Sequence, residues 1–500
     1  MMKNIKLILL AFFSTLCIIG CEDILEPTPQ GQVSLDALLS TESGLITGVN
    51  GIYQPLLNFQ GYFVHPFDMA SDDGWTWRKE TEPDLYNLDQ TFPQIENIWS
   101  NHYTGITRAN TVLFHMASID EFSSEQMKNA IEGQAKFLRA FYYFNLVRIY
   151  GGVPLILERI GSREDSEQPR ATISQVYTQI KADLTDAIQL LPTSYTGTTG
   201  MEKGRSTSYT ASALKAMVHL ELEEWGEAAS AANAVIGNGS LLPSYADNFN
   251  GSNENGPGSL FEIQWGGAIG ATTGGVSNSY APPDLNGGAA LLPSDDNMNG
   301  EGGGLSSGNG IVQMFDPGDL RRDVVFADYG LVNFIDPSRP DGSLMYIHKY
   351  YNTVDTRGQS TWNFPLIRYA EVLLIRAEAL NEQGYVADGE AFDLLNETRI
   401  NAGLTAFTSA DLANQGAFRS AVADERRKEL AFEGKRYFDL NRRGILATTV
   451  QAQMDFLSLT FPTNRLITHP ITGKSYYLHP IPLVEFLNNA RIGEQNSGYN

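Results

Sequence analysis

Two tightly joined pairs of amphipathic segments constrain the fold of this chain more than any other feature. Residues 206–224 and 225–236 form the first pair, and residues 364–383 and 386–401 form the second. Each pair carries alanines where two helices can cross closely, and each has the length of a tetratricopeptide unit, whose period is about 34 residues. We therefore expect a mainly α fold of tetratricopeptide-like helix pairs, although the chain has no strict repeat motif.

Helical spacing extends over most of the remaining scaffold. It predicts helices over residues 34–57, 93–119, 123–150 and 173–191, the last capped by Thr172. One face of the third helix is apolar: Ala135, Leu138, Tyr142, Leu146 and Ile149. Residues 123–150 and 172–191 make a third, looser pair.

Between the helix pairs the composition changes to that of loops. Residues 251–310 hold 16 of the 47 glycines, and short β-like runs occur at 259–265 and 344–351. Residues 59–92 also read as a polar, aromatic loop. Long irregular loops on a rigid frame commonly carry function. The expected divisions are a signal peptide 1–20, a tether 21–33 and one domain 34–500, with scaffold at 34–240 and 360–445, a loop-rich lobe at 241–360 and a C-terminal segment at 446–500.

The N-terminus has the pattern of a bacterial lipoprotein signal. Lys3 and Lys6 precede an apolar stretch over residues 7–19, which is too short to span a bilayer. Small Gly20 then allows cleavage before Cys21. We expect Cys21 to become the lipidated N-terminus, so that the protein sits on a membrane without spanning it.

Composition excludes several classes of partner. The formal net charge is −23, and removal of the signal takes away two lysines and no acid, which argues against nucleic acid as a partner. The other cysteine, Cys17, lies within the signal, so the mature chain has no disulfide. The seven histidines form no zinc-binding pair, and no nucleotide-binding glycine pattern occurs. We expect neither a metal nor a cofactor.

The loop around residue 75 carries the first candidate ligand residues. Trp75 and Trp77 offer flat rings on which the apolar face of a sugar can stack, and Asp72 and Asp73 beside them can accept hydroxyl hydrogen bonds. Burying one sugar face is worth on the order of 1 kcal/mol. The alternative is that both indoles pack beneath their own loop.

Three further aromatic residues are candidates of second rank. Trp265 ends an apolar strand-like run, which favours a core position. Tyr280 stands in a Gly/Ser/Asn/Pro context that gives it little to pack against. Trp362 precedes an expected helix and can instead cover its N-terminus.

Other motifs do not support catalysis or metal binding. Residues 295–300 match the first half of a calcium loop, but Ser306 replaces the glutamate at its twelfth position. Residues 304–308 match the G-x-S-x-G string without the strand-to-helix turn that it needs. Glu425, Glu429 and Glu433 share one helical stripe beside arginines, which favours ion pairs over a glycosidase carboxylate pair. Arg139 is likewise expected to be paired in the core.

Four segments together resemble the SusD/RagB family of outer-membrane lipoproteins. They are residues 139–155, 365–372, 425–440 and 480–499, the last with Ser497 where proline is more usual. They run in the family's order and span nearly the whole mature chain. The resemblance implies four tetratricopeptide-like helix pairs packed against a loop-rich lobe.

The resemblance also implies a function in nutrient uptake. Such proteins capture an oligosaccharide at the cell surface and hand it to a TonB-dependent transporter of the SusC type, on which they sit as a lid. Peptide capture, or a lid with little affinity of its own, is the first alternative. A secreted glycoside hydrolase is the second, and the absence of a facing carboxylate pair or a nucleophile constellation weighs against it.

Overall fold

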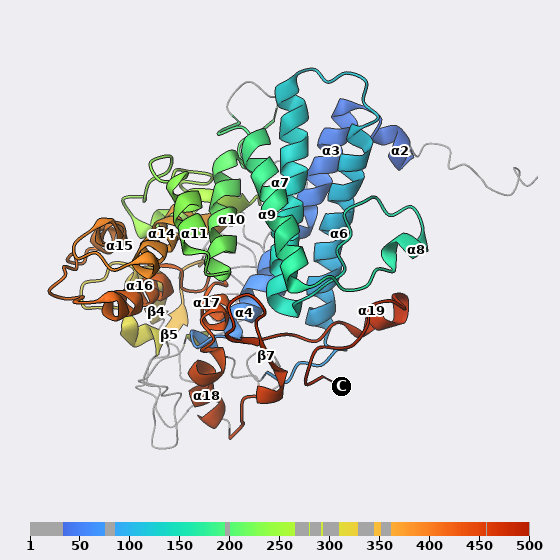
Figure 1. The fold of residues 1–500 in the computed structure, drawn as a ribbon. Coiled ribbons are helices and arrows are strands. Elements are labelled where there is room, and N and C mark those ends of the chain that lie inside the picture. Colours follow the sequence, from blue (N-terminus) through green and yellow to red (C-terminus); the bar gives the residue numbers. More distant parts are fainter. Residues whose placement is uncertain are drawn as a thin grey trace, which may run out of the picture.

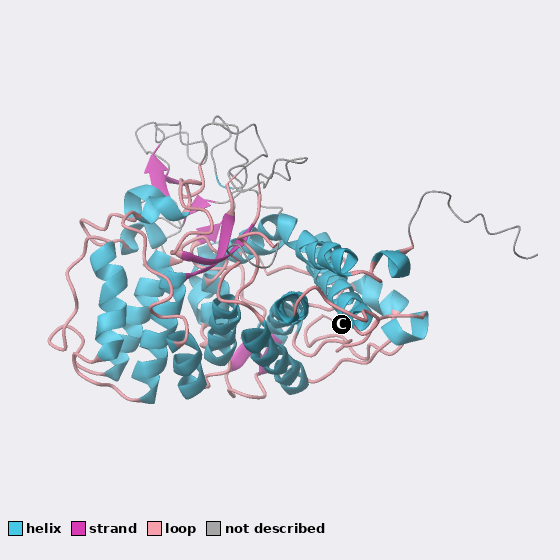
Figure 2. Ribbon diagram, turned by 90° about the horizontal axis from the view of Figure 1, so that it is seen from above, coloured by secondary structure: helices cyan, strands magenta, loops and turns pink. Residues whose placement is uncertain are grey.

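The computed structural model describes residues 34–75, 86–195, 201–265, 280, 292–293, 310–328, 345–351, 362–456 and 458–499. Helices dominate these residues and lie side by side in a curved row, as Figures 1 and 2 show. Among the helices of the described ranges, none is both long and apolar enough to cross a membrane. The expected signal, tether and Cys21 lie outside the described residues, as do the strings at 295–300 and 304–308.

Eight helices form the row, and each packs against the next in chain order. They are α3 (Glu42–Tyr53), α6 (Pro93–Met116), α7 (Glu125–Tyr150), α9 (Ile173–Leu190), α10 (Ser208–Glu221), α11 (Trp225–Asn233), α14 (Tyr369–Gln383) and α15 (Glu390–Asn401). The three expected pairs are present as α10/α11, α14/α15 and α7/α9. With α3/α6, the described part of the chain contains four helix pairs, which confirms the mainly α prediction.

Side-chain caps define where these helices begin. The hydroxyls of Thr41, Ser124, Thr172 and Thr207 each accept a hydrogen bond from the backbone N–H three residues on. Ser34 caps only a short helix, α2 (Leu35–Leu38), because Thr41 starts a new one. The single helix expected over 34–57 is therefore divided into α2, α3 and the 3₁₀ turn η2 (Gln54–Asn58).

Helix α7 is the centre of the core. Every residue from Phe137 to Tyr150 is buried, so the helix is enclosed on all sides rather than on one apolar face. Its neighbour α6 approaches it closely at Gly105, where an added Cβ would lie 2.1 Å from a ring carbon of Tyr142. The Tyr142 hydroxyl donates to the Ile52 carbonyl at 2.6 Å, which fixes the ring in place.

The expected helix over 364–383 is wrong in its first turn. Residues Phe364–Arg368 form strand β6, which pairs antiparallel with β2 (Ser259–Ile263). All five residues of β6 are buried, and a strand enclosed on both faces has no alternating pattern to identify it. Helix α14 follows directly at Tyr369.

The expected loop over 59–92 is also partly helical. Residues Gln60–Val64 form the wide turn η3, and His65–Met69 form α4. The rings of Phe59, Phe63 and Phe67 follow one another at helical spacing, with centroids 4.4 and 4.9 Å apart. This i, i+4 ladder of rings was the missed helical signal.

The strands form small sheets at the edge of the helical row. In the described residues there are three further antiparallel pairs: β1 (Gly74–Trp75) with β3 (Leu292–Pro293), β4 (Phe326–Asp328) with β5 (Met345–Ile347), and β7 (Leu466–Thr468) with β8 (Ser475–Tyr477). The β-like runs expected at 259–265 and 344–351 are thus confirmed as β2 and β5.

The remaining elements are α8 (Arg163–Ser166), η4 (Tyr245–Asn248), η7 (Ile311–Met314), α13 (Arg322–Val325), α16 (Gln415–Glu429), α17 (Arg436–Arg442), α18 (Leu446–Phe456), η8 (Thr463–Arg465) and α19 (Leu483–Asn488).

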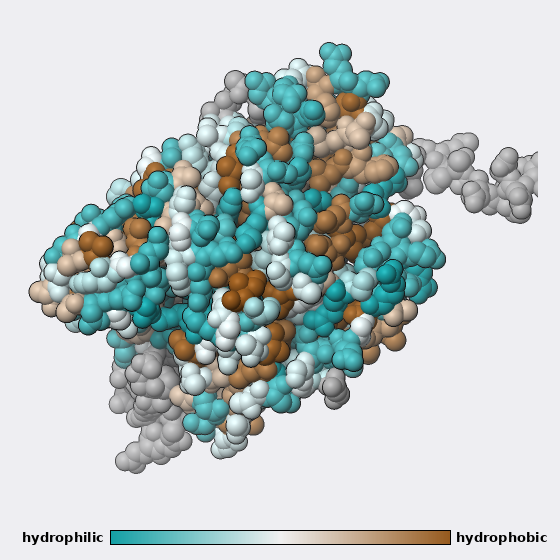
Figure 3. Space-filling view, in the orientation of Figure 1, coloured by the Kyte–Doolittle hydropathy of each residue, from teal (hydrophilic) through white to brown (hydrophobic). Residues whose placement is uncertain are grey.

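The C-terminal segment returns to the first helices, below α6 and α7 in Figure 1. The His479 N–H donates to the Ile149 carbonyl at 2.8 Å, and Arg170 donates to the Asn496 side chain at 2.6 Å. The end of the chain is therefore part of the scaffold. On the face drawn in Figure 3, hydrophilic side chains cover most of the surface and hydrophobic ones show between them.

The close approach of α6 and α7 gives a stability prediction. Gly105→Ala should lower the free energy of unfolding by about 1–3 kcal/mol, because the new methyl group overlaps the fixed Tyr142 ring. Gly226→Ala is the matched control, since nothing lies within 4 Å of its added Cβ. It should leave stability unchanged or raise it by up to about 1 kcal/mol. Urea unfolding of both variants measures the difference, and equal midpoints would contradict the packing described here.

Candidate functional site

Trp265 joins the end of β2 to the N-terminal turns. Its indole Nε1 donates to the Leu57 carbonyl at 3.0 Å, and its backbone N–H donates to the Asn363 side chain at 2.8 Å. The residue is 5% exposed, as a core position predicts, but its ring edge lines a surface recess. Leu57 lines two hollows, and Trp265 lines one of them.

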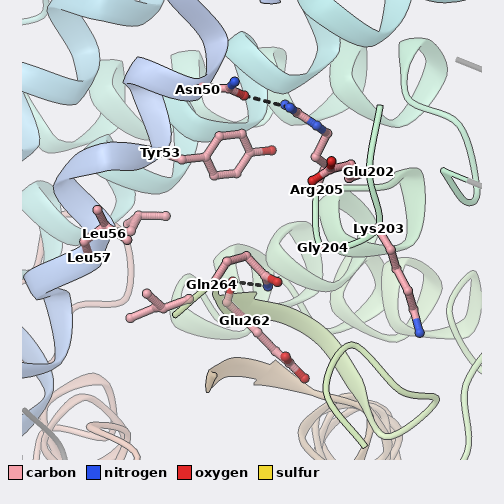
Figure 4. Close-up of a pocket in the computed structure, with 11 residues that line it drawn as sticks. Asn50, Tyr53, Leu56, Leu57, Glu202, Lys203, Gly204, Arg205, Glu262 and Gln264 are labelled. Carbon is pink, nitrogen blue, oxygen red and sulfur yellow. Dashed lines mark hydrogen bonds between the residues drawn. The ribbon is translucent and has the colours of Figure 1, made fainter. Parts of the chain in front are cut away.

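The first hollow, called here the tyrosine recess, has a volume of about 180 Å³. Figure 4 shows the Tyr53 ring pointing into it, between Arg205 and Gln264. Its walls come from α3, η2, the residues before α10 and the end of β2. The lining residues are Asn50, Tyr53, Leu56, Leu57, Glu202, Lys203, Gly204, Arg205, Glu262, Ile263 and Gln264.

Hydrogen bonds hold the walls of the tyrosine recess in place. The Tyr53 hydroxyl donates to Gln134 at 3.0 Å, and burial raises the pKa of Tyr53, so that it stays a neutral donor. Arg205 donates to Asn50 at 2.7 Å. Glu262 accepts from the Asn255 N–H and from the Asn363 amide, and burial raises the pKa of its carboxyl.

The second hollow, called here the amide recess, has a volume of about 600 Å³. It shares Leu57 with the tyrosine recess and is bounded by Trp265, by η2 and η3, and by the start of α6. Its lining is aromatic and carboxamide in character: Leu57, Asn58, Gln60, Gly61, Tyr62, Phe92, Pro93, Gln94, Asn97, Asn101 and Trp265. Rings beside hydrogen-bonding amides are the groups that recognise a sugar, which has an apolar face and a rim of hydroxyls.

The expectation that Asp72 and Asp73 accept ligand hydroxyls is not met. Both are buried, and both are paired with arginines from the distant α16 and α17. Arg427 Nε lies 2.6 Å from Asp73, and Arg436 Nε lies 2.7 Å from Asp72. The charges of these arginines outweigh burial and hold the pKa of Asp72 below its usual value. Their partners lie more than 350 residues away in the sequence, so the pairing could not be read from the loop itself.

The expected exposure of Tyr280 is likewise wrong. The residue is 1% exposed, and its hydroxyl donates to the buried carboxyl of Asp68 at 2.6 Å. The other Asp68 oxygen accepts from the Gly434 N–H at 2.8 Å. Burial raises the pKa of Asp68 to about 8, so this carboxyl is mainly protonated at neutral pH. Tyr280 ties the glycine-rich region to α4 and offers no stacking face.

The other predicted aromatic residues are only partly described. For Trp75 the structure gives the backbone, which pairs with Leu292, and Trp77 lies outside the described residues. Trp362 is half-buried beside Gly251, where an added Cβ would lie 2.4 Å from the indole. It precedes the strand β6 and not a helix, so the expected N-terminal covering role does not apply.

The charged groups set aside as structural do form ion pairs. Arg139 forms a bidentate pair with Asp183, with N–O distances of 2.7 and 2.8 Å. Helix α16 ends at Glu429, so Glu433 lies beyond it and the expected three-residue stripe is not continuous. The closest ion pairs of these three glutamates reach across the fold, although Glu425 also lies 3.9 Å from Lys428 along the helix. Glu425 and Glu429 contact Arg321, and Glu433 contacts Arg368 and Lys349. Among the described residues, no three His, Cys, Asp or Glu side chains are grouped to hold a metal ion.

Sequence reasoning missed the amide recess, since its residues come from two separate segments, 57–62 and 92–101, and from Trp265. A weak signal was available. Between Asn50 and Ser71 the chain has only His65 and Asp68 as ionisable groups besides its tyrosines, while asparagine and glutamine recur among aromatic residues. Such a composition is unusual in a chain of which 19% is charged. The spacing of these residues alone does not predict that they line a recess.

Two family models match the chain. The model described as SusD family matches residues 338–499, and one described as starch-binding associating with outer membrane matches residues 31–220. The second description places the proteins that it covers at the outer membrane.

Relatives match along the whole length. SusD-like protein P2 of Formosa agariphila is 28% identical, with all of both chains covered. A SusD superfamily protein of Bacteroides vulgatus has the same fold, with a TM-score of 0.75 at 21% identity, over 92% of this chain and 99% of that one. A laminarin-binding SusD-like protein aligns with a TM-score of 0.69 at 23% identity, over 91% and 99% of the two chains.

The Asp68–Tyr280 contact gives a pH prediction. Because the folded-state pKa of Asp68 is raised from 3.8 to about 8, its contribution to stability is largest below pH 3.8 and is lost as the pH rises towards 8. Asp68→Asn cannot titrate, so the fall in its melting temperature between pH 5 and pH 8 should be smaller than that of the wild type. The exposed Asp120→Asn serves as the control. Equal pH profiles for wild type and Asp68→Asn would refute the assignment.

Proposed function

The chain belongs to the SusD/RagB family, and from that premise we propose that it captures oligosaccharides at the cell surface and delivers them to a TonB-dependent transporter of the SusC type. The observation that carries the proposal is the amide recess, because its rings and carboxamides match the two kinds of surface that a sugar presents. The laminarin-binding relative supports glycan as the ligand class.

Capture takes place without cleavage. Proteins of this family bind glycans and are non-catalytic. Hydrolysis of a glycosidic bond needs two carboxyl groups that face each other across the ligand. The described residues that line the amide recess include no carboxylate, and Asp72 and Asp73 are held by arginines.

The lipid anchor at Cys21 belongs to the same proposal. Two or more acyl chains would hold the protein on the outer membrane, and residues 22–33 would tether one SusD-like domain over 34–500. The tether supports this arrangement by its two prolines and its lack of helical spacing. Such a tether leaves the domain free to close over a partner.

The loop tryptophans are a second part of the proposal. Strand β1 pairs with β3, so the loop that carries Trp75 and Trp77 joins the glycine-rich region at residues 292–293. We propose that these two indoles stack on the sugar chain. Handover to a transporter requires release, so we expect micromolar to millimolar dissociation constants, or about −8 to −4 kcal/mol.

A double substitution tests the stacking. Trp75→Ala/Trp77→Ala should weaken binding of the best oligosaccharide by about tenfold or more, because two ring faces of about 1 kcal/mol each are removed. The control is Phe114→Ala, which removes a ring that is 55% exposed at the far end of α6. Isothermal calorimetry measures both variants.

Two results would count against this function. Unchanged affinity in the double variant would remove both tryptophans from the site. If the protein co-purified with a TonB-dependent transporter but retained no oligosaccharide by itself, the protein would act as a lid and not as the capturing component.

A further inference from the structure

The amide recess differs from the rest of this acidic protein by its lack of charge. Among the eleven described residues that line it, none is Asp, Glu, Lys, Arg or His, in a chain with 93 charged side chains of the first four types and a net charge of −23. The ionisable group among these eleven is the Tyr62 phenol, whose hydroxyl donates to the Pro55 carbonyl at 3.1 Å and whose pKa is raised by burial. The described lining is therefore neutral at physiological pH.

We propose that the amide recess is a subsite for neutral, hydroxyl-rich sugar residues and that it selects against sugars with carboxylate or sulfate groups. This inference rests on the proposed function, because it takes the ligand to be a glycan. It adds the chemical class of that glycan and the side chains that set it.

The carboxamides are suited to hydroxyl groups in particular. A hydroxyl both donates and accepts hydrogen bonds, and a carboxamide offers both roles on one planar group. Asn58 and Asn97 are exposed, and within the described part of the chain their side chains make no hydrogen bond. They are free to turn towards a ligand.

Two other carboxamides are already oriented. Gln94 Nε2 donates to the Tyr62 carbonyl at 2.8 Å, and Asn101 Nδ2 donates to the Asn97 carbonyl at 2.8 Å. Each amide is held by one N–H and keeps its second N–H and its oxygen for other partners. A ligand that binds them does not have to order these side chains first, which reduces the entropic cost of binding.

A fifth carboxamide of the lining belongs to Gln60. This residue is 1% exposed, and among the described residues its Nε2 makes no hydrogen bond. An unpaired buried N–H costs about 1–3 kcal/mol. A ligand hydroxyl that reached Gln60 would remove this cost.

The rings supply the apolar half of the subsite. Phe92 is half-buried, and it lines the recess together with Tyr62 and Trp265. The Tyr62 and Trp265 rings are fixed through hydrogen bonds to the Pro55 and Leu57 carbonyls. A sugar can therefore place its C–H face on rings and its hydroxyl rim on amides.

An anionic sugar would find no compensation in this recess. A carboxylate or sulfate that enters loses hydration, and none of the described lining residues offers a cation to replace it. The negative charge of the whole protein adds to this penalty. The basic residues Lys203 and Arg205 line the tyrosine recess instead.

Isosteric charge insertion tests the inference. The full chain would be screened on an array of neutral and anionic polysaccharides, including laminarin and its sulfated form. Asn97→Asp and, separately, Asn58→Asp would then be titrated with the best-bound neutral oligosaccharide. Each substitution keeps the side-chain shape but replaces the amide donor with a charge.

The control is Asn233→Asp, an exposed position of α11 outside the recess. Circular dichroism melting confirms that all variants are folded.

We expect the wild type to retain neutral polysaccharides and to discriminate against the sulfated form. Asn97→Asp and Asn58→Asp should each bind about tenfold more weakly, whereas Asn233→Asp should match the wild type. Preference for anionic polysaccharides, or equal affinity of all three variants, would overturn the neutral subsite and leave glycan capture intact. Retention of no polysaccharide at all would overturn the capture function, and the subsite with it.

Discussion

A buried network of ion pairs around α16 holds the separate parts of this molecule together. Glu425 and Glu429 of this helix bind Arg321, Glu429 also binds Arg368 of β6, and Arg427 reaches back to Asp73 beside β1. These partners come from loops, a strand and the N-terminal third of the chain. Loss of one partner from such a buried pair costs about 3–5 kcal/mol, because the other charge stays in the core without compensation. The lobe and the helical row therefore have one relative position.

That fixed position allows a recess to form between distant segments. The helical row supplies η2 and the start of α6, and the sheet β2/β6 brings Trp265 against Leu57. Burial alone would raise the pKa of Glu433. The charges of Arg368 and Lys349 outweigh burial and hold this pKa below its usual value, so the glutamate stays ionised. The buried charges around α16 thus specify how the parts dock. The described lining of the amide recess contains no charged side chain.

The helices were predictable and their long-range partners were not. Thr172 and the 3.6-residue spacing after it are local signals, and α9 begins where they indicate. Phe364–Arg368 is a fully enclosed strand, whose apolar run looks the same as a helical turn until its partner β2 is known. Asp72 and Asp73 have the composition of a polar ligand loop, and only the folded chain brings Arg427 and Arg436 to them. The amide recess escaped prediction for the same reason, since no single segment contains it.

The docking of the last residues onto the first helices has a consequence for the order of folding. The carbonyls of Ile149 and Tyr150 find their partners in His479 and Asn496, more than 300 residues later. A chain that lacks its final segment cannot make these contacts, so the hydrogen bonding at the end of α7 is complete only when residues 479–496 have docked.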